Sequence, residues 1–497
     1  MDHAMPKASA LLSLTLACAL PACHEPPRTR AQTHGPTLAC AQEHTEPIVA
    51  RAGGFAHRLE RVTASAGCVL TLKGFEAIDE VHVASGATVT LREVAELGTV
   101  RIEGEESSPA ALTLEDIGVL TRRLFLQQHA AVLAKRIERM GSVGFRGPGN
   151  VLTAEDIARV RGPAFISPGS SLAATRSAFA AVTFLGGPGG SLSLEDTTAG
   201  ALNLKMNRGT GPIALRRVEL EELDVAEEQE KAPRRVTLED ARVAGDVRVR
   251  TRASVEGAGV HVGGIWTLEG ETSARLSKSE LQGEVVLDFK TALLLVDSTV
   301  GGAVAMHSDQ VLVHKGTTFS VPLPEAKHLV ALGPQDDVGA GFDAAVRARD
   351  LAALRGRLLS KATELVCRSA FDACVEAREE ARGAMSMSFE LTRTGDVLTG
   401  ALTDVSEALG EVRPCIEDSV QRRSGGVQSK LRGYYEGAFA AAMTCTASVA
   451  KVGDALATTI SPTFEWREEL TRLPHPTATA RTPRAASRAR QASPRRP

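Results

Sequence analysis

The chain has few aromatic residues and no strong excess of charge of either sign. Phe, Trp and Tyr make up 4% of its 497 residues, with only two Trp and two Tyr. Sites that hold sugars or single-stranded nucleic acid usually stack them on aromatic rings, so a long aromatic groove is not expected. A net charge of −3 gives no overall attraction to nucleic acid or anionic lipid. The sequence therefore predicts no specific nucleic-acid partner.

The sequence also lacks the short motifs of common catalytic sites. It contains no glycine-rich phosphate loop, no HExxH, no nucleophile elbow and no convergent Ser/His/Asp set. It therefore predicts no catalytic residue, no metal ligand and no cofactor. A hydrophobic content of 43% is ordinary for a folded chain, and the length predicts two or three domains.

What the chain does contain is a repeat of about 20 residues. Each copy opens on an apolar, a polar and an apolar residue, as in Leu70-Thr71-Leu72. Successive copies start 19, 23, 20, 20, 20, 20, 21, 23, 19, 19, 19 and 18 residues apart. The starts are Leu70, Val89, Leu112, Val132, Leu152, Leu172, Leu192, Ile213, Val236, Val255, Ala274, Leu293 and Val311.

A period near 20 is typical of a stacked solenoid, and the two-residue alternation within each copy is that of a β-strand. We predict a mainly β fold, a single-stranded parallel β-helix over residues 49–330, on the order of 60 Å long at ~4.8 Å per strand. A β-sandwich is the alternative, but it gives no reason for four consecutive intervals of 20. The copy at 236–249 resembles the L-x-L-x-x-A-x-I-x-G-x-L-x-L units of bacterial β-solenoid proteins, which informs the fold only.

The N-terminal segment is interpreted as a targeting signal. An apolar run over residues 8–20 is too short to span a bilayer and ends in Leu20-Pro21-Ala22-Cys23. This ending resembles a bacterial lipobox, which implies cleavage before Cys23 and lipidation of Cys23. His24, rather than Asp, implies outer-membrane sorting. Cys18 is an alternative anchor, and an ordinary secretory signal is an alternative reading.

We therefore expect a signal peptide over residues 1–22 and a flexible tether over residues 23–48. The expected location is outside the cytoplasm of a Gram-negative bacterium, anchored to the outer membrane and either periplasmic or on the cell surface. The expected partner at this end is the lipid bilayer, bound through an N-terminal acyl chain.

The cysteines predict disulfides, because six remain once Cys18 and Cys23 are assigned to the signal and the anchor. The six are Cys40, Cys68, Cys367, Cys374, Cys415 and Cys445. Cys40 and Cys68 are expected to attach a cap to the first turn. Cys367 and Cys374 lie ~10.5 Å apart along an expected helix, too far to bond to each other, so they pair with Cys415 and Cys445 in one order or the other. A zinc site is disfavoured because no CxxC pair is present.

Near residue 333 the repeat stops and a helical period begins. We expect a helix between 342 and 382, strands at 385–391 and 397–402, and helices at 406–422 and 427–459. The last helix would turn Tyr434, Tyr435, Phe439 and Met443 toward its core. The prediction is a disulfide-bonded helical or α+β cap over residues 340–470 that shields the open end of the solenoid. Residues 473–497, rich in Arg and without acids, are expected to form a disordered basic tail.

The order helix, hairpin, helix, with a Cys in each helix, resembles the TonB-like C-terminal domains of bacterial envelope proteins. The segments that carry it are Phe371-Asp372-Ala373-Cys374, Met387-Ser388-Phe389-Glu390-Leu391, Gly395-Asp396-Val397, Ser406-Glu407-Ala408-Leu409 and Val412-Arg413-Pro414-Cys415-Ile416. The resemblance covers about 60 residues. It implies a Cys374–Cys415 bridge, which leaves Cys367 for Cys445. The chain departs from the family after Arg422, where the family has another strand and a helix is expected here.

Acidic pairs recur at one phase of the repeat: Glu115-Asp116, Glu155-Asp156, Glu195-Asp196 and Glu239-Asp240. Such a ladder could bind Ca²⁺ or supply the acid and base of a polysaccharide lyase or hydrolase. Intervening turns place Lys135-Arg136 and Arg216-Arg217 at the same phase, however. That alternation favours charge pairing between neighbouring turns on a solvated face.

The sequence as a whole favours a non-enzymatic lipoprotein of the cell envelope that serves as a structural scaffold or a binding surface. Its partner beyond the bilayer would be an envelope protein or a glycan. One alternative is a polysaccharide-active β-helix enzyme, in which Asp196 and Asp240 would be required for turnover. A surface adhesin is the other alternative.

Overall fold

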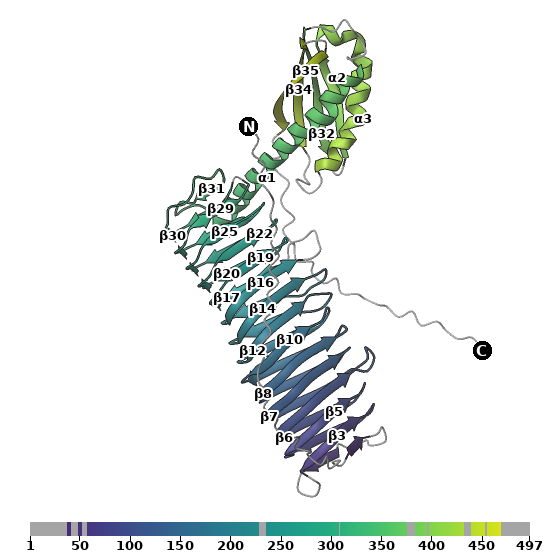
Figure 1. The fold of residues 1–497 in the computed structure, drawn as a ribbon, viewed down its shortest axis with the longest axis vertical. Coiled ribbons are helices and arrows are strands. Elements are labelled where there is room, and N and C mark those ends of the chain that lie inside the picture. Colours follow the sequence, from purple (N-terminus) through teal and green to yellow (C-terminus); the bar gives the residue numbers. More distant parts are fainter. Residues whose placement is uncertain are drawn as a thin grey trace, which may run out of the picture.

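The computed structural model describes residues 37–40, 48–51, 57–227, 235–307, 309–374, 383–394, 397–431, 439–452 and 455–468. The chain first winds into a parallel β-solenoid of about 14 turns, and a smaller α+β domain follows (Figure 1). The predicted β-helix with a disulfide-bonded C-terminal region is therefore confirmed. The signal peptide, Cys23, Tyr434, Tyr435 and the basic tail lie outside the described residues.

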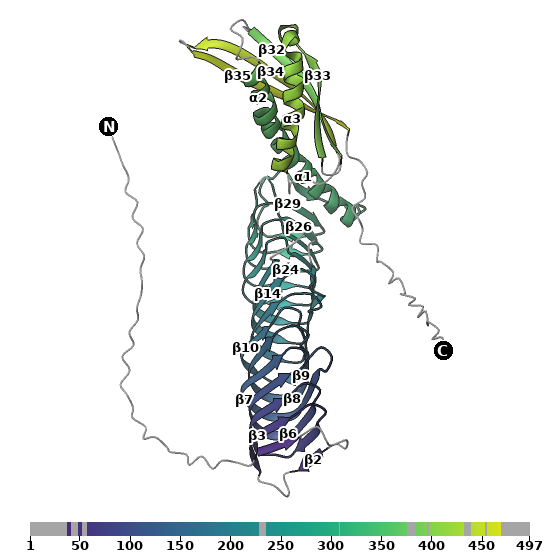
Figure 2. The same cartoon turned by 90° about the vertical axis from the view of Figure 1, so that its right-hand side faces the viewer.

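Each turn contributes to three columns of parallel strands that run along the rod (Figure 2). The first column contains β2 (Ile48–Arg51), β4 (Val69–Lys73), the N-terminal parts of β6 (Thr88–Glu103), β7 (Ala110–Gln127) and β8 (Ala130–Arg146), then β9 (Val151–Ile157), β11 (Ser171–Thr175), β13 (Leu192–Glu195), β15 (Ile213–Arg216), β17 (Arg235–Glu239), β20 (Ser254–Ala258), β23 (Ser273–Ser277), β26 (Ala292–Val296), β29 (Val311–Lys315) and β31 (Leu329–Ala331).

In the earlier turns the second and third columns share one bent strand. These strands are the remainders of β6, β7 and β8 together with β3 (Arg58–Ala64), β5 (Ala77–Val83), β10 (Val160–Ile166), β12 (Ala178–Leu185), β14 (Thr198–Met206) and β16 (Glu219–Glu227). In the later turns the second column is β18 (Arg242–Val243), β21 (His261–Val262), β24 (Glu280–Leu281), β27 (Thr299–Val300) and β30 (Thr318–Phe319). The third column is β19 (Val247–Arg250), β22 (Trp266–Glu269), β25 (Val285–Leu287) and β28 (Val304–Ala305), and β1 (Thr37–Cys40) starts it beside β3.

The apolar residues of the repeat lie one above another inside the rod. Leu70 pairs with Val89, Val89 with Leu112, and the register continues through Leu293. Every one of these side chains is at most 3% exposed, because alternate residues of a strand point to the same side. The last predicted start is wrong by one residue, since Leu293 pairs with Leu312 and Val311 pairs with Ala292. Val311, Leu312 and Val313 are all apolar, so the sequence did not show which of them faces the core.

The helix α1 (Val338–Ala362) contributes to two hydrophobic cores. In its first half, Phe342 and Ala345 pack with Leu294 and Val313 of the rod. In its second half, Leu354, Leu358 and Ala362 belong to the core of the C-terminal domain. Leu294 and Val313 are the outward positions of β26 and β29, so α1 covers the outer face of the first column. Phe319, Leu323 and Leu329 pack against the rod core at its last turns.

The C-terminal domain is a four-stranded antiparallel sheet with helices against one face. Its elements are η1 (Thr363–Arg368), α2 (Ser369–Cys374), β32 (Gly383–Thr394), β33 (Val397–Val405), η2 (Glu407–Val412), α3 (Arg413–Leu431), β34 (Phe439–Val452) and β35 (Ala455–Glu468). The strand order is β33-β32-β34-β35. Met387, Phe389 and Leu391 of β32 face the helices and are fully buried.

The predicted helix over residues 427–459 is wrong from Phe439 onward, because β34 and the first five residues of β35 occupy that part of the segment. Ala441, Met443, Cys445 and Ala447 are buried in alternation, which is the period of a strand. The segment is rich in alanine, so its local propensity suggested a helix. Pairing with β32 overrides that propensity.

Three disulfides link the described cysteines. Cys40 of β1 bonds to Cys68, just before β4, with Cα atoms 5.9 Å apart. Cys374 bonds to Cys415, and Cys367 bonds to Cys445. The prediction that Cys367 and Cys374 pair with Cys415 and Cys445 is confirmed, in the order that the resemblance implied.

Candidate functional site

The acidic pairs of the repeat lie at the corner that follows the first column. Asp116, Asp156 and Asp196 each occupy a left-handed backbone conformation there, with φ of 57°, 56° and 49°. Aspartate tolerates this region better than most residues. Arg136, Arg176 and Arg217 occupy the same corner on the intervening turns, with φ of 50°, 47° and 47°. Acid and base therefore alternate along one edge of the rod.

These corner residues are bonded to each other across turns. The Nε atoms of Arg136, Arg176 and Arg217 each lie 2.6 Å from a carboxylate oxygen of the aspartate one turn earlier. The adjacent row pairs in the same manner, with Lys135 Nζ 2.8 Å from Glu155 and Arg216 Nε 2.7 Å from Glu239. The expected pairing between neighbouring turns is what the structure forms. We call these residues the corner ladder.

The arginines of the corner ladder favour the ionised form of the three aspartates. Hydrogen bonds from Arg136, Arg176 and Arg217 lower the pKa of Asp116, Asp156 and Asp196 below its ordinary value. A general acid needs the opposite, a raised pKa that keeps a proton available near neutral pH. The chemistry of these residues is that of a solvated ion-pair array between stacked turns.

A second cluster of specific contacts lies where α1 meets the rod. Arg349 is 8% exposed, and its Nη1 donates to the carbonyl oxygens of Lys290 and Thr291 at 2.9 and 3.0 Å. Arg275 of β23 lies 3.0 Å from the Asp343 carboxylate and places its guanidinium 4.9 Å from the centre of the Phe342 ring. Asp337 caps the helix by accepting from the Ala340 amide at 2.7 Å. The contacts of Arg349 and Arg275 attach α1 to the rod; we call them the joint.

Two histidines lie in the last turns beside the joint. His314 pairs in register with the core residue Leu295 and packs edge-on against Phe319, with ring centres 5.1 Å apart. His328 is 8% exposed, and its carbonyl accepts from the Leu312 amide. Burial lowers the pKa of both imidazoles, and nearby Lys327 and Arg349 lower that of His328 further. The folded structure therefore favours the neutral form of both imidazoles.

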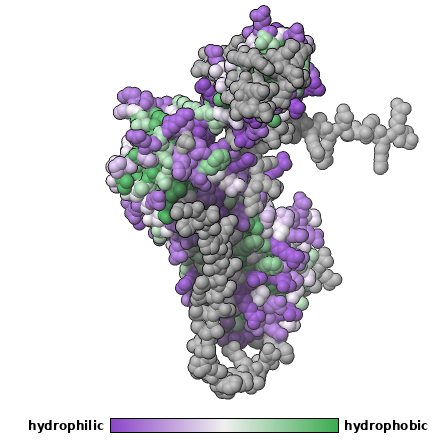
Figure 3. Space-filling model, turned by 45° about the horizontal axis from the view of Figure 1, so that its top comes forward, coloured by the Kyte–Doolittle hydropathy of each residue, from purple (hydrophilic) through white to green (hydrophobic). Residues whose placement is uncertain are grey.

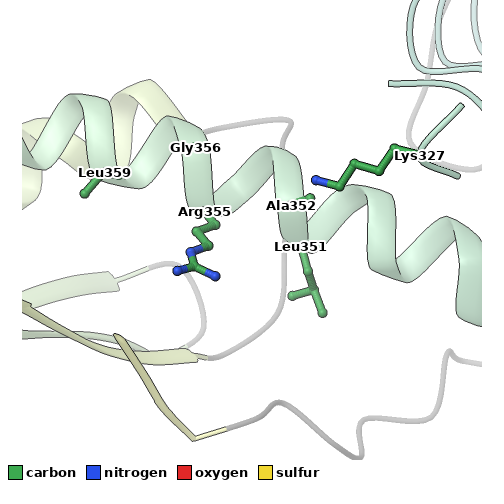
Figure 4. A pocket seen from close by; sticks show the side chains of 6 residues that line it. All are labelled: Lys327, Leu351, Ala352, Arg355, Gly356 and Leu359. Atoms are coloured by element: carbon green, nitrogen blue, oxygen red, sulfur yellow. The ribbon is translucent and has the colours of Figure 1, made fainter. Parts of the chain in front are cut away.

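The joint borders an open cavity of about 470 Å³ beside α1 (Figure 4). Its lining is Lys327, Leu351, Ala352, Arg355, Gly356 and Leu359. Figure 4 shows Leu351 and Arg355 projecting from one side of α1, while Lys327 comes from a segment before the helix. The lining has no carboxylate, imidazole or thiol that could act as acid, base or nucleophile. A second cavity of about 410 Å³ continues along α1 toward Ile460 and Pro462 of β35.

Some chemistry-bearing residues lie where the sequence could not place them. Trp266, the one tryptophan of the rod, points into the core and is 0% exposed, so it offers no stacking surface. Within the described ranges, no three His, Cys, Asp or Glu residues gather as metal ligands would. In that same part of the chain, none of the helices combines the length and apolarity needed to cross a membrane.

The docking of α1 on the outer face was missed, although the sequence carries a signal for it. Outward positions of the first column are small or polar through most of the rod, as at Thr90, Thr113 and Ser193. They become apolar at Leu294 and Val313, so that 292–296 and 311–313 read as unbroken apolar runs. Parallel strands covered on both faces have this pattern.

No protein-family model, no curated protein and no solved structure matches the chain.

Proposed function

We propose that the protein is a non-enzymatic scaffold of the Gram-negative cell envelope, a rod that is tethered to a lipid anchor at Cys23 and holds its C-terminal domain at a set distance from its first turn. The bilayer is its partner at the N-terminal end, and an envelope protein or glycan is its partner elsewhere. The localisation is the outer membrane, facing the periplasm or the cell surface.

The observation that carries this proposal is the shared helix α1. The first turn and the C-terminal domain lie at opposite ends of an unbroken stack (Figures 1 and 2). Because α1 belongs to the cores of both units, movement of the domain relative to the rod would require its buried contacts to separate. About 14 turns at ~4.8 Å per strand give a span of roughly 65 Å.

A finer part of the proposal concerns the C-terminal domain. We propose that this domain, like the TonB-like domains that it resembles, contacts its partner through a single edge of its sheet. What supports this is β34: a strand follows α3, as in that family, where a helix had been expected. Cross-linking from exposed positions at the two sheet edges, Val397 of β33 and Ser461 of β35, would test it. Capture of one envelope protein from both edges, or from neither, contradicts contact through a single edge.

The scaffold role is tested by changing the length of the rod. Deleting residues 172–212 removes two turns of 20 and 21 residues and brings Ile213 to the place of Leu172, with the same inward phase. Duplicating the same residues adds two turns. We expect the C-terminal domain to move by about 10 Å toward or away from the first turn, as measured by the distance between spin labels on the first turn and on the domain. In cells, complementation should weaken with either change in length.

The enzyme alternative is tested by Asp196→Asn combined with Asp240→Asn, which keeps the length. The scaffold proposal expects full complementation by this variant. If it abolishes turnover of an acidic glycan while the length variants complement, the protein is an enzyme. Mass spectrometry of the N-terminal peptide, with Cys23→Ser as control, tests the anchor.

A further inference from the structure

Two of the few aromatic residues lie on the outer face of the third column. Phe125 of β7 pairs in register with Gly144 of β8, and Gly144 pairs with Phe165 of β10. All three point outward, because their neighbours Leu124 and Val143 point into the core. Phe165 is 44% exposed and Phe125 is half-buried. We call Phe125, Gly144 and Phe165 the Phe platform.

Gly144 places no side chain between the two rings. A Cβ at this position would lie 3.3 Å from the Phe125 ring, so the ring lies beside Gly144 and a larger side chain would push it aside. The surface beyond Phe165 is uncharged, with Thr183 and then Asn203 in register on the next two turns. On the face that Figure 3 shows, hydrophilic and hydrophobic side chains are mixed along the rod.

Polar groups flank the Phe platform along the same strands. Arg123 lies two residues before Phe125, is exposed, and donates from Nε to Ser142 Oγ at 3.4 Å. On the other side Gln127 pairs in register with Arg146, and Arg146 is exposed. Isolated rings with hydrogen-bonding side chains beside them suit a ligand that is apolar on its ring faces and polar on its edges. A protein sheet packing on this face would instead leave Arg123 and Arg146 beside an apolar contact.

The two rings are two strands apart, or about 9.6 Å along the rod axis. In an extended β-1,4-linked polysaccharide, successive sugars are turned over relative to each other, so the same face recurs on every second sugar. That two-sugar repeat is close to the spacing of the rings. The apolar C–H face of a pyranose stacks on an aromatic ring, and the equatorial hydroxyl and amide groups point sideways.

We propose that the Phe platform binds an extended β-1,4-linked polysaccharide running along the rod, with alternate sugars stacked on Phe125 and Phe165. Gly144 leaves room for the sugar between them, and Arg123, Gln127 and Arg146 contact the edges of the sugars. This goes beyond the scaffold role and does not depend on it, because the length of the rod and the lipid anchor play no part.

The test uses the full chain and two soluble probes, the hexasaccharides of β-1,4-linked glucose and of β-1,4-linked N-acetylglucosamine, in titration calorimetry. We expect at least one to bind, and a disaccharide to bind far more weakly because it cannot reach both rings. Phe125→Ala with Phe165→Ala should weaken binding by about a hundredfold, on the order of tenfold for each ring. Phe289→Ala, which removes a ring that is 50% exposed elsewhere, is the matched control and should change nothing.

A second variant keeps both rings and blocks the space between them. Gly144→Leu should abolish hexasaccharide binding, and Phe125→Tyr with Phe165→Tyr should retain it; circular dichroism confirms that each variant is folded. Binding by neither probe, or equal binding by the double alanine variant, overturns the proposal. It is also overturned if the double alanine variant changes only self-association, since the face would then contact a second copy of the chain.

Discussion

In the rod, each strand pairs with neighbours about 20 residues away, as Leu70 does with Val89 and Leu152 with Leu172. In the C-terminal domain, Met387 of β32 pairs with Cys445 of β34, and a hairpin and a helix intervene. The rod is thus stabilised by many equivalent short-range interfaces, while the domain depends on a few long-range links. Damage to the rod should stay near the altered turn, whereas damage to the domain should spread through all of it.

The largest expected effect is local and lies in the rod. Trp266→Ala removes a fully buried ring and should lower the local stability by about 3–5 kcal/mol. Hydrogen exchange should accelerate in β19, β22 and β25, the strands around Trp266, while β32 and β34 keep their protection. Equal acceleration in both regions would mean that the rod and the domain unfold as one unit, which would end the comparison.

Removing a disulfide should act on the domain as a whole. Cys367→Ala with Cys445→Ala opens a bridge between residues 78 apart and should lower the domain's free energy of unfolding by about 2–5 kcal/mol. Denaturant titration should shift the transition of the domain and leave that of the rod unchanged. The matched control, Cys40→Ala with Cys68→Ala, should affect only the first turns. Loss of rod structure in the Cys367 variant would contradict this division.

The joint between the two regions should be weakened by a single substitution. Arg349→Ala removes two hydrogen bonds from a buried guanidinium to backbone carbonyls and should cost about 1.5–3 kcal/mol of helix docking. Distances between spin labels on the rod and on the domain should broaden. Arg347→Ala, an exposed position on the same helix, is the control. An unchanged distance distribution in the Arg349 variant would remove the basis for a rigid spacer.

The smallest effects are expected from pH, and they separate the last turns of the rod from the corner ladder. A lowered imidazole pKa means that unfolding takes up protons below the ordinary value of 6.5. The contribution of neutral His314 and His328 to the free energy of unfolding is therefore full above about pH 6.5 and declines as the pH falls below it. The lowered pKa of Asp116, Asp156 and Asp196 keeps their contribution in place down to about 3.8, and it is lost as the pH falls further.

Between pH 7 and pH 5.5 the hydrogen-exchange protection of β29 and β31, corrected for the intrinsic exchange rate at each pH, should consequently fall. The corrected protection beside the corner ladder should stay constant. His314→Gln with His328→Gln should remove the change, and His261→Gln, an exposed rod histidine, should not. A change that begins in both places at one pH would show that the histidines do not set the response of the last turns.

Much of this protein could be read from its sequence because the repeat is a local property. A period of about 20 with two-residue alternation requires residues such as Leu112, Leu152 and Leu192 to stack, and the alternating signs of Asp116 and Arg136 required their pairing once they stacked. The disulfide partners followed from helix geometry and a partial resemblance.

Tertiary structure alone decided the rest, since those features depend on contacts between residues far apart in the chain. An alanine-rich segment became β34 because β32 offered it a partner, which local propensity does not reveal. The outer face of β26 and β29 received α1 because Leu294 and Val313 there left apolar surface uncovered. Phe125 and Phe165 form one surface only because two turns of the solenoid bring residues 40 positions apart to either side of Gly144.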